Sequence, residues 1–447
     1  MPQKILLVSQ VYPPDPAAVA RAMGDVGAEL NARGNDVVVL TSDRGYDDPS
    51  TRFPSREVSH GVDVRRLPFC SFGKQSITFR LLGGVSFTLQ AFLHALLLPG
   101  LDTVVVSTAP PMASFVGWCV GVLRRVRVVY WPMDLNPDQA VALGFAREGS
   151  LSVRLLEWLN RAVLRRADVV IALDRAMARR LERKRPIGDK LIIVPPWAEE
   201  DAPAAVPPQE NPFRVAHGLI GKRVIMYAGT LGLANPVTTL LKAAERFEDR
   251  SDLVFLFVGG GAGMSEVRAR NRPNVRWLPY QPFEQLPYSL SAGDVHVVSL
   301  GDDMAGIVHP CKVYGAMARG RPVLYVGPPH SHVTEMLDDA TFGWQVRHGD
   351  VAGAVGVIRE ILEADGTALE QMGEHGRKLV ERDRTRSVSC GRVCDAIEGG
   401  ARPGRKGEDS ALNDASDERP RIHAADAKPI LRRDADVSTQ PAEGRAR

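Results

Sequence analysis

Short runs of apolar, largely β-branched residues alternate with stretches of helical periodicity along most of this chain. In the first half, strands are expected at 4–9, 36–41, 103–107, 126–131, 168–172 and 190–194, with helices between them, for example at 17–31 and 151–166. Strands that alternate with helices pair in parallel, are covered on both faces and connect through right-handed crossovers. The alternation therefore predicts an α/β fold built on a doubly wound, Rossmann-like sheet.

A proline-rich stretch at 195–212 interrupts the alternation, because its six prolines cannot all belong to a helix or a strand ladder. A second alternating set follows, with strands expected at 223–228, 253–258, 275–278, 295–299, 322–326 and 342–346. We therefore expect two Rossmann-like domains that face each other across a cleft.

The domain boundaries follow from these shifts in composition. The N-terminal domain is placed at 1–197, the linker at 198–212 and the C-terminal domain at 213–384. A terminal helix is expected at 385–398, with a return to the N-terminal domain as one option. Residues 399–447 contain no Phe, Tyr or Trp and mix both charges with small residues, which predicts a disordered tail.

Charge and cysteine content exclude several classes. The 56 Lys and Arg residues against 53 Asp and Glu leave a net charge of +3, which argues against a nucleic-acid partner. The five cysteines form neither CxxC pairs nor a disulfide framework, and the apolar run at 5–8 is too short for a secretory signal, so a cytoplasmic protein is expected. The apolar stretch 81–98 predicts a helix that is buried or touches a membrane, with a membrane span as the alternative.

Arginines gather in the later part of the first domain. Arg175, Arg179 and Arg183 recur every four residues and so share one helical face. Others lie at Arg124, Arg125, Arg127, Arg161, Arg165 and Arg166. The pattern fits either a solvated charged face or a patch that attracts anionic lipid head groups, which would make the protein peripheral on the inner face of the cytoplasmic membrane.

The stretch 309–324 contains a loop that leads into a helix expected from about Lys312 and then into an apolar strand. Free N–H groups and the dipole at a helix N-terminus favour an anion, and a lysine adds a positive charge that phosphate accepts. The alternative is an ordinary strand–loop–helix connection with a solvated lysine.

Other loops at the carboxyl ends of strands are candidates for a ligand site, since ligands of open α/β sheets bind there. Asp134 and Asp138 follow one strand and could contact sugar hydroxyls or cap a helix. Glycines follow the first and second strands of the second domain, where they serve ligand approach or turn formation. The G-x-G-x-x-G dinucleotide fingerprint is not matched, which disfavours a hydride-transfer enzyme, and no metal-ligand cluster is visible in the sequence.

Taken together, the segments 9–16, 131–144, 166–173, 227–232 and 274–282, with the stretch 319–323, resemble the family 4 glycosyltransferases of the GT-B fold. The likeness covers residues 4 to about 397 and is greatest to the branch that builds cell-surface polysaccharide and lipopolysaccharide. It implies that the second domain holds a nucleotide sugar, that the first holds a glycan or lipid-linked acceptor, and that transfer retains the anomeric configuration. No cofactor or metal is implied beyond the nucleotide-sugar co-substrate.

The resemblance also assigns residues. Asp134 and Lys312 are predicted to be catalytic, with Lys312 stabilising the diphosphate leaving group. The predicted donor-binding residues are Gly229, Thr230, Gly259, Gly261, Pro279, Tyr280, Gly306, His309, Pro310, Lys312 and Tyr314. The predicted acceptor-binding residues are Pro14, Asp15 and Asp138.

Two departures from the family pattern qualify this assignment. The usual pair of glutamates, eight positions apart, falls on Ile307 and Gly315, and the basic residues often found after the second domain's first strand are absent at 230–236. Two further functions therefore stay open: a sugar-nucleotide epimerase of the same fold, and a non-catalytic binder of sugar nucleotides or glycans.

Overall fold

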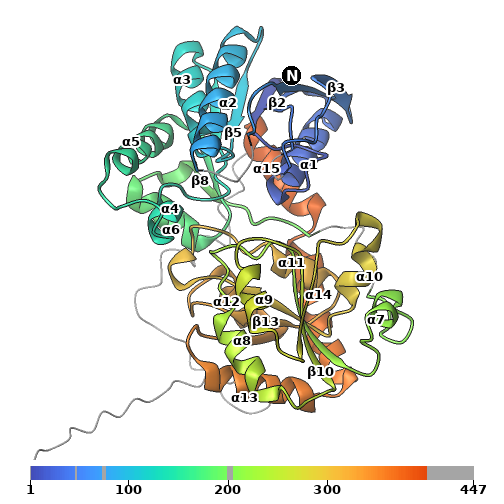
Figure 1. Ribbon diagram of the computed structural model, residues 1–447. Coiled ribbons are helices and arrows are strands. Elements are labelled where there is room, and N and C mark those ends of the chain that lie inside the picture. Colours follow the sequence, from blue (N-terminus) through green and yellow to red (C-terminus); the bar gives the residue numbers. More distant parts are fainter. Residues whose placement is uncertain (1, 46–47, 73–76, 199–204, 400–447) are drawn as a thin grey trace, which may run out of the picture.

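The computed structural model describes residues 2–45, 48–72, 77–198 and 205–399. Two α/β domains, each a wholly or largely parallel sheet covered by helices on both faces, stack end to end (Figure 1). The predicted fold class is thus confirmed. Part of the predicted linker, 199–204, and all of the predicted tail except Gly399 lie outside the described residues.

The N-terminal sheet has eight strands in the order β3-β4-β2-β1-β5-β6-β7-β8. Their bounds are β1 (Lys4–Val8), β2 (Asp36–Ser42), β3 (Arg56–Ser59), β4 (Val62–Leu67), β5 (Thr103–Val106), β6 (Arg127–Tyr130), β7 (Val169–Ala172) and β8 (Leu191–Ile193). All pairs are parallel except β3 with β4, which form an antiparallel hairpin at the edge. This hairpin was not predicted, because an edge strand with one solvated face lacks the continuous apolar run of a central parallel strand.

The C-terminal sheet has six parallel strands in the order β11-β10-β9-β12-β13-β14. Their bounds are β9 (Arg223–Ala228), β10 (Leu253–Val258), β11 (Val275–Leu278), β12 (Val295–Ser299), β13 (Val323–Val326) and β14 (Gly343–Val346). The order reverses between β9 and β12, so the carboxyl ends of these two strands flank a topological switch point.

Helices connect the strands in both domains. In the N-terminal domain they are α1 (Ala18–Ala32), α2 (Ile77–Leu97), α3 (Ser114–Arg124), α4 (Asp138–Ala142), α5 (Leu151–Arg166) and α6 (Arg175–Lys184). Those that follow are α7 (Pro212–Ala216), α8 (Thr238–Ala244), α9 (Met264–Arg270), α10 (Leu286–Ser291), α11 (Lys312–Ala318), α12 (His332–Asp339), α13 (Val351–Glu363), α14 (Gly366–Asp383) and α15 (Arg386–Glu398). Within the described residues, Thr78–Leu97 is the helix that is long and apolar enough to cross a membrane, and a third of it is buried.

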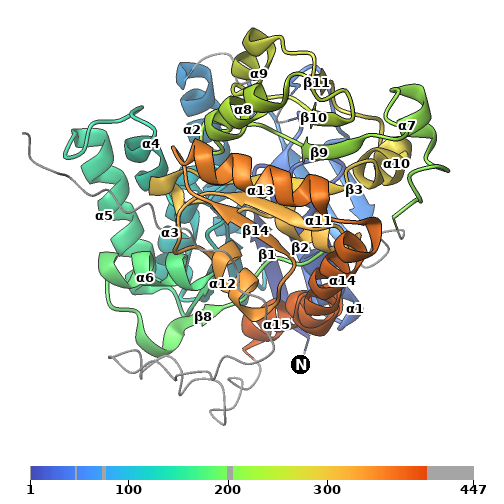
Figure 2. The same cartoon turned by 90° about the horizontal axis from the view of Figure 1, so that it is seen from below.

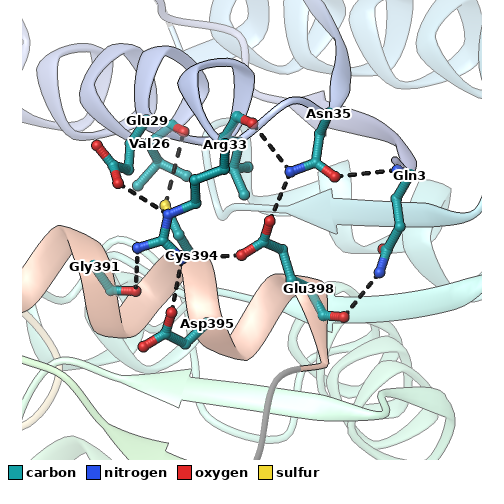
Figure 3. Close-up of polar contacts among 10 residues, drawn as sticks. Gln3, Val26, Glu29, Arg33, Asn35, Gly391, Cys394, Asp395 and Glu398 are labelled. Atoms are coloured by element: carbon teal, nitrogen blue, oxygen red, sulfur yellow. Dashed lines mark hydrogen bonds and ion pairs between the residues drawn. The ribbon is translucent and has the colours of Figure 1, made fainter. Parts of the chain in front are cut away.

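The last described helix, α15, packs against α1 of the N-terminal domain (Figure 2). Its apolar side, including Val393 and Ile397, belongs to the N-terminal core. Figure 3 shows the polar contacts: Arg33, the residue just after α1, donates to Asp395 at 2.7 Å and to Glu398 at 2.9 Å. The chain therefore passes between the domains twice.

The two crossings touch each other, since the N–H of Ala198 donates to the carbonyl of Arg384 at 3.2 Å. Beside them the indole of Trp197 donates to Asp25 at 2.8 Å, which ties the first crossing to α1. The paired crossings hold the carboxyl ends of the two sheets facing each other.

Candidate active site between the two domains

The loop from β12 to α11 reaches into the N-terminal domain. The N–H of Leu135 donates to the carbonyl of Ile307 at 2.9 Å, and Arg180 donates to the carbonyl of Ala305 at 2.7 Å. Gly306 has a φ of +71°, and a Cβ there would lie 2.5 Å from the carbonyl carbon of Ala176 on α6. This predicted donor-binding glycine is thus required by the contact between the domains as well as by its backbone conformation.

Lys312 lies at the start of α11, and its side chain reaches toward the carboxyl end of β9. Its ammonium nitrogen lies 5.5 Å from the centre of the Tyr227 ring. Gly229 has a φ of +108°, and a Cβ there would lie 3.0 Å from Cε of Lys312. Lys312 makes no ion pair with the described residues, and burial lowers the pKa of its ammonium group. A partly buried cation without a carboxylate partner is suited to an anionic ligand.

The loops after β9 and β10 pack closely through glycine. A Cβ on Gly259 would lie 2.2 Å from the carbonyl oxygen of Gly229, and one on Gly261 would lie 2.5 Å from that of Leu231. The N–H of Leu231 donates to the carbonyl of Gly260 at 2.7 Å. Contact between backbones therefore accounts for these glycines without a ligand.

An exposed wall borders these loops. The hydroxyl groups of Thr230 and Tyr280 are hydrogen-bonded at 2.7 Å, and both residues are exposed, as is Pro279. The Tyr280 ring covers Gly260, where a Cβ would lie 2.8 Å from the ring. Thr230, Pro279 and Tyr280 thus stand together at the carboxyl ends of β9 and β11, as the donor-binding prediction requires, and an exposed aromatic ring there can stack on a base.

The backbone at the start of α11 is less open than the sequence suggested. The N–H groups of Cys311, Val313 and Tyr314 donate to the carbonyls of His309, Pro310 and Cys311, at 2.9, 3.3 and 3.2 Å. We expected free N–H groups there to bind an anion, and local turns engage these three. The predicted anion-binding role of this loop therefore depends on the side chain of Lys312 rather than on these N–H groups.

A buried chain of polar side chains crosses the domain boundary at His309. Its Nδ1 lies 2.7 Å from Oδ2 of Asp174, the N-cap of α6, and its Nε2 lies 2.9 Å from the hydroxyl of Tyr314. That hydroxyl in turn lies 2.6 Å from Nε2 of His332. The side chain of His309 is 1% exposed, so water does not compete for these bonds. His309, predicted to bind the donor, connects the domains through Asp174. Tyr314, also predicted to bind the donor, is bonded to His309 and His332 within the C-terminal domain.

Burial and neighbouring charges shift the pKa values of two of these side chains, Asp174 and His332. Burial alone would raise the pKa of Asp174, but hydrogen bonding and charge from His309 outweigh it and lower that pKa to about 2. Burial lowers the pKa of His332 well below its usual value, and the nearby His309 adds to the effect. A neutral His332 beside an ionised Asp174 is the resulting charge state near neutral pH.

Asp134 follows β6 and faces the same loop from the N-terminal domain. Its N–H and that of Met133 donate to the hydroxyl of Thr108, at 3.1 and 3.0 Å, which fixes the turn. Burial raises the pKa of Asp134 to about 6, an effect that the neighbouring His309 partly opposes. A carboxyl group whose pKa is raised toward neutral pH, at the contact between the domains, has the properties of a catalytic acid or base.

The predicted acceptor-binding residues differ in their surroundings. Asp138 is paired with Lys184 of α6 at 2.6 Å, which favours a structural role over ligand contact. Asp15 is 8% exposed and accepts the N–H of Ala17 at 3.1 Å, just before α1 begins. Pro14, next to it, is exposed.

The two positions that depart from the family pattern have opposite environments. Ile307 is 2% exposed and packs into the core of the N-terminal domain. Gly315 lies on α11, and a Cβ there would meet only Arg319, at 3.9 Å. Position 307 therefore rejects a carboxylate, whereas position 315 has room for one. Among the described residues no group of three or more His, Cys, Asp or Glu side chains is arranged to hold a metal ion.

The arginine stripe of α6 lies at the domain boundary. Arg179 is 4.0 Å from Glu335 on α12, and the charges of Arg175 and Arg179 both act on that glutamate. The sequence allows a lipid-binding role for this stripe, and its proximity to the C-terminal domain disfavours that role. Arg180, which lies off the predicted stripe, makes the hydrogen bonds to the β12–α11 loop.

Comparison with known protein families identifies both domains. Residues 17–197 match the family described as "Glycosyl transferase 4-like domain", and residues 222–364 match "Glycosyl transferases group 1". The chain belongs to the family 4 glycosyltransferases. This glycosyltransferase is 25% identical over 343 residues to WbjE of Pseudomonas aeruginosa, which is named a probable glycosyltransferase. The alignment covers 74% of this chain and 83% of WbjE. It is 24% identical over 358 residues to WcaI of Escherichia coli K12, named a colanic acid biosynthesis glycosyl transferase, covering 75% and 86%.

Solved structures with the same fold include two that place the glycosyltransferase among GT-B proteins. Sucrose-phosphate synthase of Thermosynechococcus elongatus superposes with a TM-score of 0.70 at 19% identity, over 89% of this chain and 98% of that one. HepE of Anabaena in complex with UDP superposes with a TM-score of 0.64 at 14% identity, over 89% and 100%. At these identities the likeness concerns the fold.

Three residues of the site were not predicted from the sequence: Asp174, Arg180 and His332. Asp174 stands two positions after β7 and just before a helix, so the rule that ligand-site residues follow strand ends could have found it. His332 and Arg180 carry no such signal. His332 contacts Tyr314 within the C-terminal domain, and Arg180 reaches the carbonyl of Ala305, 125 positions away, only through the packing of the domains.

Proposed function

We propose that this glycosyltransferase moves a sugar from a UDP- or GDP-linked donor to a lipid-linked or polysaccharide acceptor in cell-surface glycan biosynthesis, with retention of configuration. The observation that carries the donor part is Lys312, a partly buried ammonium group beside the end of β9 that lacks a carboxylate partner in the described ranges. The names of WbjE and WcaI support a role in building polysaccharide. HepE, of the same fold, binds UDP.

In the proposed reaction the bond between the sugar and the nucleoside diphosphate breaks, and negative charge develops on the leaving phosphate. Lys312 is in a position to stabilise that charge, because Gly229 leaves room for its side chain at the end of β9. A fixed cation in a partly desolvated site stabilises charge far better than one in water, and burial has already removed much of its hydration. We propose that this makes a metal ion unnecessary for transfer.

Asp134 is proposed to face the transferred sugar and the acceptor hydroxyl. Its raised pKa, about 6, lets the carboxylate accept a proton from a hydroxyl near neutral pH. His309, which Asp174 orients through its Nδ1, lies on the other side of the same contact between the domains. Transfer would then depend on both domains, with donor charge and acceptor activation coming from opposite sides of the cleft.

The test is incubation of purified protein with a panel of UDP and GDP sugars, with and without a detergent-dispersed polyprenyl-phosphate-sugar acceptor. We expect transfer to the acceptor, insensitivity to EDTA, and a product whose anomeric proton in NMR shows the donor's configuration. An isomerised donor without any acceptor would indicate an epimerase. Binding of nucleotide sugar without turnover across acceptors would indicate the non-catalytic binder that Ile307 and Gly315 leave open.

A further inference from the structure

The loop between β12 and α11, residues 300–311, is attached to both domains. At its start the N–H of Gly301 donates to the carbonyl of Ala234, in the loop after β9, at 2.8 Å. At its end α11 begins with Lys312, whose side chain reaches back to the end of β9. Both ends of the loop therefore belong to the C-terminal domain, whereas its middle meets the N-terminal domain.

Helix α6, at the end of the N-terminal domain that faces the C-terminal domain, holds the middle of this loop (Figure 1). The Nε of Arg180 donates to the carbonyl of Ala305 at 2.7 Å, and its Nη2 donates to the carbonyl of Asp303 at 3.2 Å. A guanidinium group is a rigid planar fork, so two bonds to nearby carbonyls fix both the position and the orientation of the backbone that accepts them.

Two more contacts with α6 hold the same segment. A Cβ on Gly306 would lie 2.5 Å from the carbonyl carbon of Ala176, so the loop backbone lies directly against the helix. The imidazole of His309 binds the carboxylate of Asp174, the N-cap of α6, at 2.7 Å. Three points along α6 thus contact the segment 303–309, and Arg180 is the one that binds its backbone by hydrogen bonds.

The bonds within the loop determine its shape but not its place. The N–H groups of Ile307 and Val308 both donate to the carbonyl of Met304, at 2.9 and 3.2 Å, which closes a turn. Such a turn can move as a unit when nothing outside it is attached. Arg180 attaches it to α6 through two carbonyls that this turn leaves free of those local bonds.

The position of Lys312 follows from the position of this segment. Only two residues separate Lys312 from His309. Over that distance the N–H of Cys311 donates to the carbonyl of His309 at 2.9 Å, and the N–H of Val313 donates to the carbonyl of Pro310 at 3.3 Å. These short turns form a stiff connection, so a shift in the middle of the loop moves the ammonium group of Lys312 as well.

We propose that Arg180 is a positioning residue of the donor site, which holds the β12–α11 loop from the N-terminal domain so that Lys312 is presented at the end of β9. Arg180 acts on a bound nucleoside diphosphate through the loop. The affinity for the nucleotide therefore depends on contact between the domains, although Lys312 belongs to the C-terminal one. The inference rests on the proposed donor role of Lys312.

The first experiment is hydrogen exchange of backbone amides in the purified full chain without nucleotide. The test variant Arg180→Met keeps the length of the side chain and removes its donors, and the matched control is Arg183→Met, exposed one turn later on α6. We expect exchange at 300–311 to be about threefold or more faster in Arg180→Met and unchanged in Arg183→Met, with β1 and β9 protected as in wild type. Unchanged exchange of the loop in Arg180→Met would overturn the proposal.

The second experiment is titration of UDP and GDP into wild type, Arg180→Met, Arg180→Lys, Lys312→Ala and the double variant Arg180→Met/Lys312→Ala. We expect affinity to fall about fivefold in Arg180→Met and less in Arg180→Lys, which retains one donor group. The double variant should bind within about twofold of Lys312→Ala, because Arg180 acts through Lys312. An arginine that merely stabilises the fold acts independently, so losses that multiply in the double variant would overturn the proposal.

The two experiments separate this inference from the function on which it rests. A wild-type chain that binds neither nucleotide contradicts the proposed donor site, and the exchange measurement, which uses no nucleotide, still decides whether Arg180 holds the loop. Weaker binding by Lys312→Ala with wild-type affinity in Arg180→Met would overturn the positioning role alone. If Arg180→Met does not fold, Arg180→Lys takes its place in both measurements, with a smaller change expected in the same direction.

Discussion

Replacing Asp174 with alanine tests whether the polar chain at the domain boundary stabilises the protein beyond an ordinary helix cap. The carboxylate accepts the N–H of Met177 at 2.7 Å as the N-cap of α6 and binds Nδ1 of His309 at 2.7 Å. Losing a cap costs about 1 kcal/mol. Losing a charge-assisted hydrogen bond and leaving the buried Nδ1 of His309 without its partner costs about 2 kcal/mol more. The expected destabilisation is therefore about 3 kcal/mol.

The shift of the Asp174 pKa gives an independent value for the cost of losing the bond to His309. The pKa falls from 3.8 to about 2, which corresponds to about 2 kcal/mol of stabilisation of the folded state. Because the folded pKa is depressed, this stabilisation is fully present above about pH 4 and is lost as the pH falls toward 2. The gap between wild type and Asp174→Ala should accordingly narrow below pH 4.

The assay is urea unfolding followed by tryptophan fluorescence at pH 7, 5 and 3. Asp365→Ala is the matched control, because Asp365 also caps a helix, accepting the N–H of Ala368 at 2.7 Å, but makes its bond in an exposed position. It should cost about 1 kcal/mol. Equal losses in the two variants, or a deficit in Asp174→Ala that does not depend on pH, would refute the reasoning.

Three further outcomes follow from the site. Gly229→Ala should weaken UDP binding at least tenfold in calorimetry and lower the melting temperature, because the position has a φ of +108° and borders Lys312. Gly356→Ala, inside α13 with nothing within 4 Å, should leave UDP binding unchanged and not lower the melting temperature. Asp134→Asn should lower kcat by about 10²-fold or more, and unchanged kcat in a transfer assay would contradict the role proposed for Asp134. The same variant should stabilise the fold by about 2 kcal/mol at pH 7, because the pKa of Asp134 is raised to about 6 in the folded protein. Ionisation of this carboxyl therefore destabilises the folded wild type as the pH rises from about 4 to 6. In thermal melts, Gly315→Glu should change the free energy of unfolding by no more than about 0.5 kcal/mol, whereas Ile307→Glu should lower it by about 3 kcal/mol or more. Equal effects would contradict an open position 315 and a buried position 307.

The sequence predicted the central sheet architecture because continuous apolar runs identify buried parallel strands with little ambiguity. The strands at 223–228 and 253–258 have the bounds that were expected. The hairpin of β3 and β4 was not predicted, because its four-residue outer strand, Arg56–Ser59, is polar and only partly buried. Local composition carries the signal in the first case and not in the second.

The site was predictable where chemistry follows a strand end. Asp134 was proposed because it follows a strand end, and Lys312 because it stands where a loop leads into a helix. What the sequence could not supply is the pairing across domains: Asp174 meets His309 across 135 positions, and that contact depends on how the domains pack. The same packing buries Ile307, which explains physically why a carboxylate is absent there.

Isothermal titration of UDP and GDP into wild type, Lys312→Ala and the control Lys242→Ala, an exposed lysine of α8, tests the central claim most directly. If the site between the domains binds a nucleoside diphosphate through this lysine, at least one nucleotide binds wild type and Lys242→Ala with the same affinity. Lys312→Ala then binds it at least tenfold more weakly. Equal affinity in all three proteins, or no binding of either nucleotide by wild type, would contradict the account.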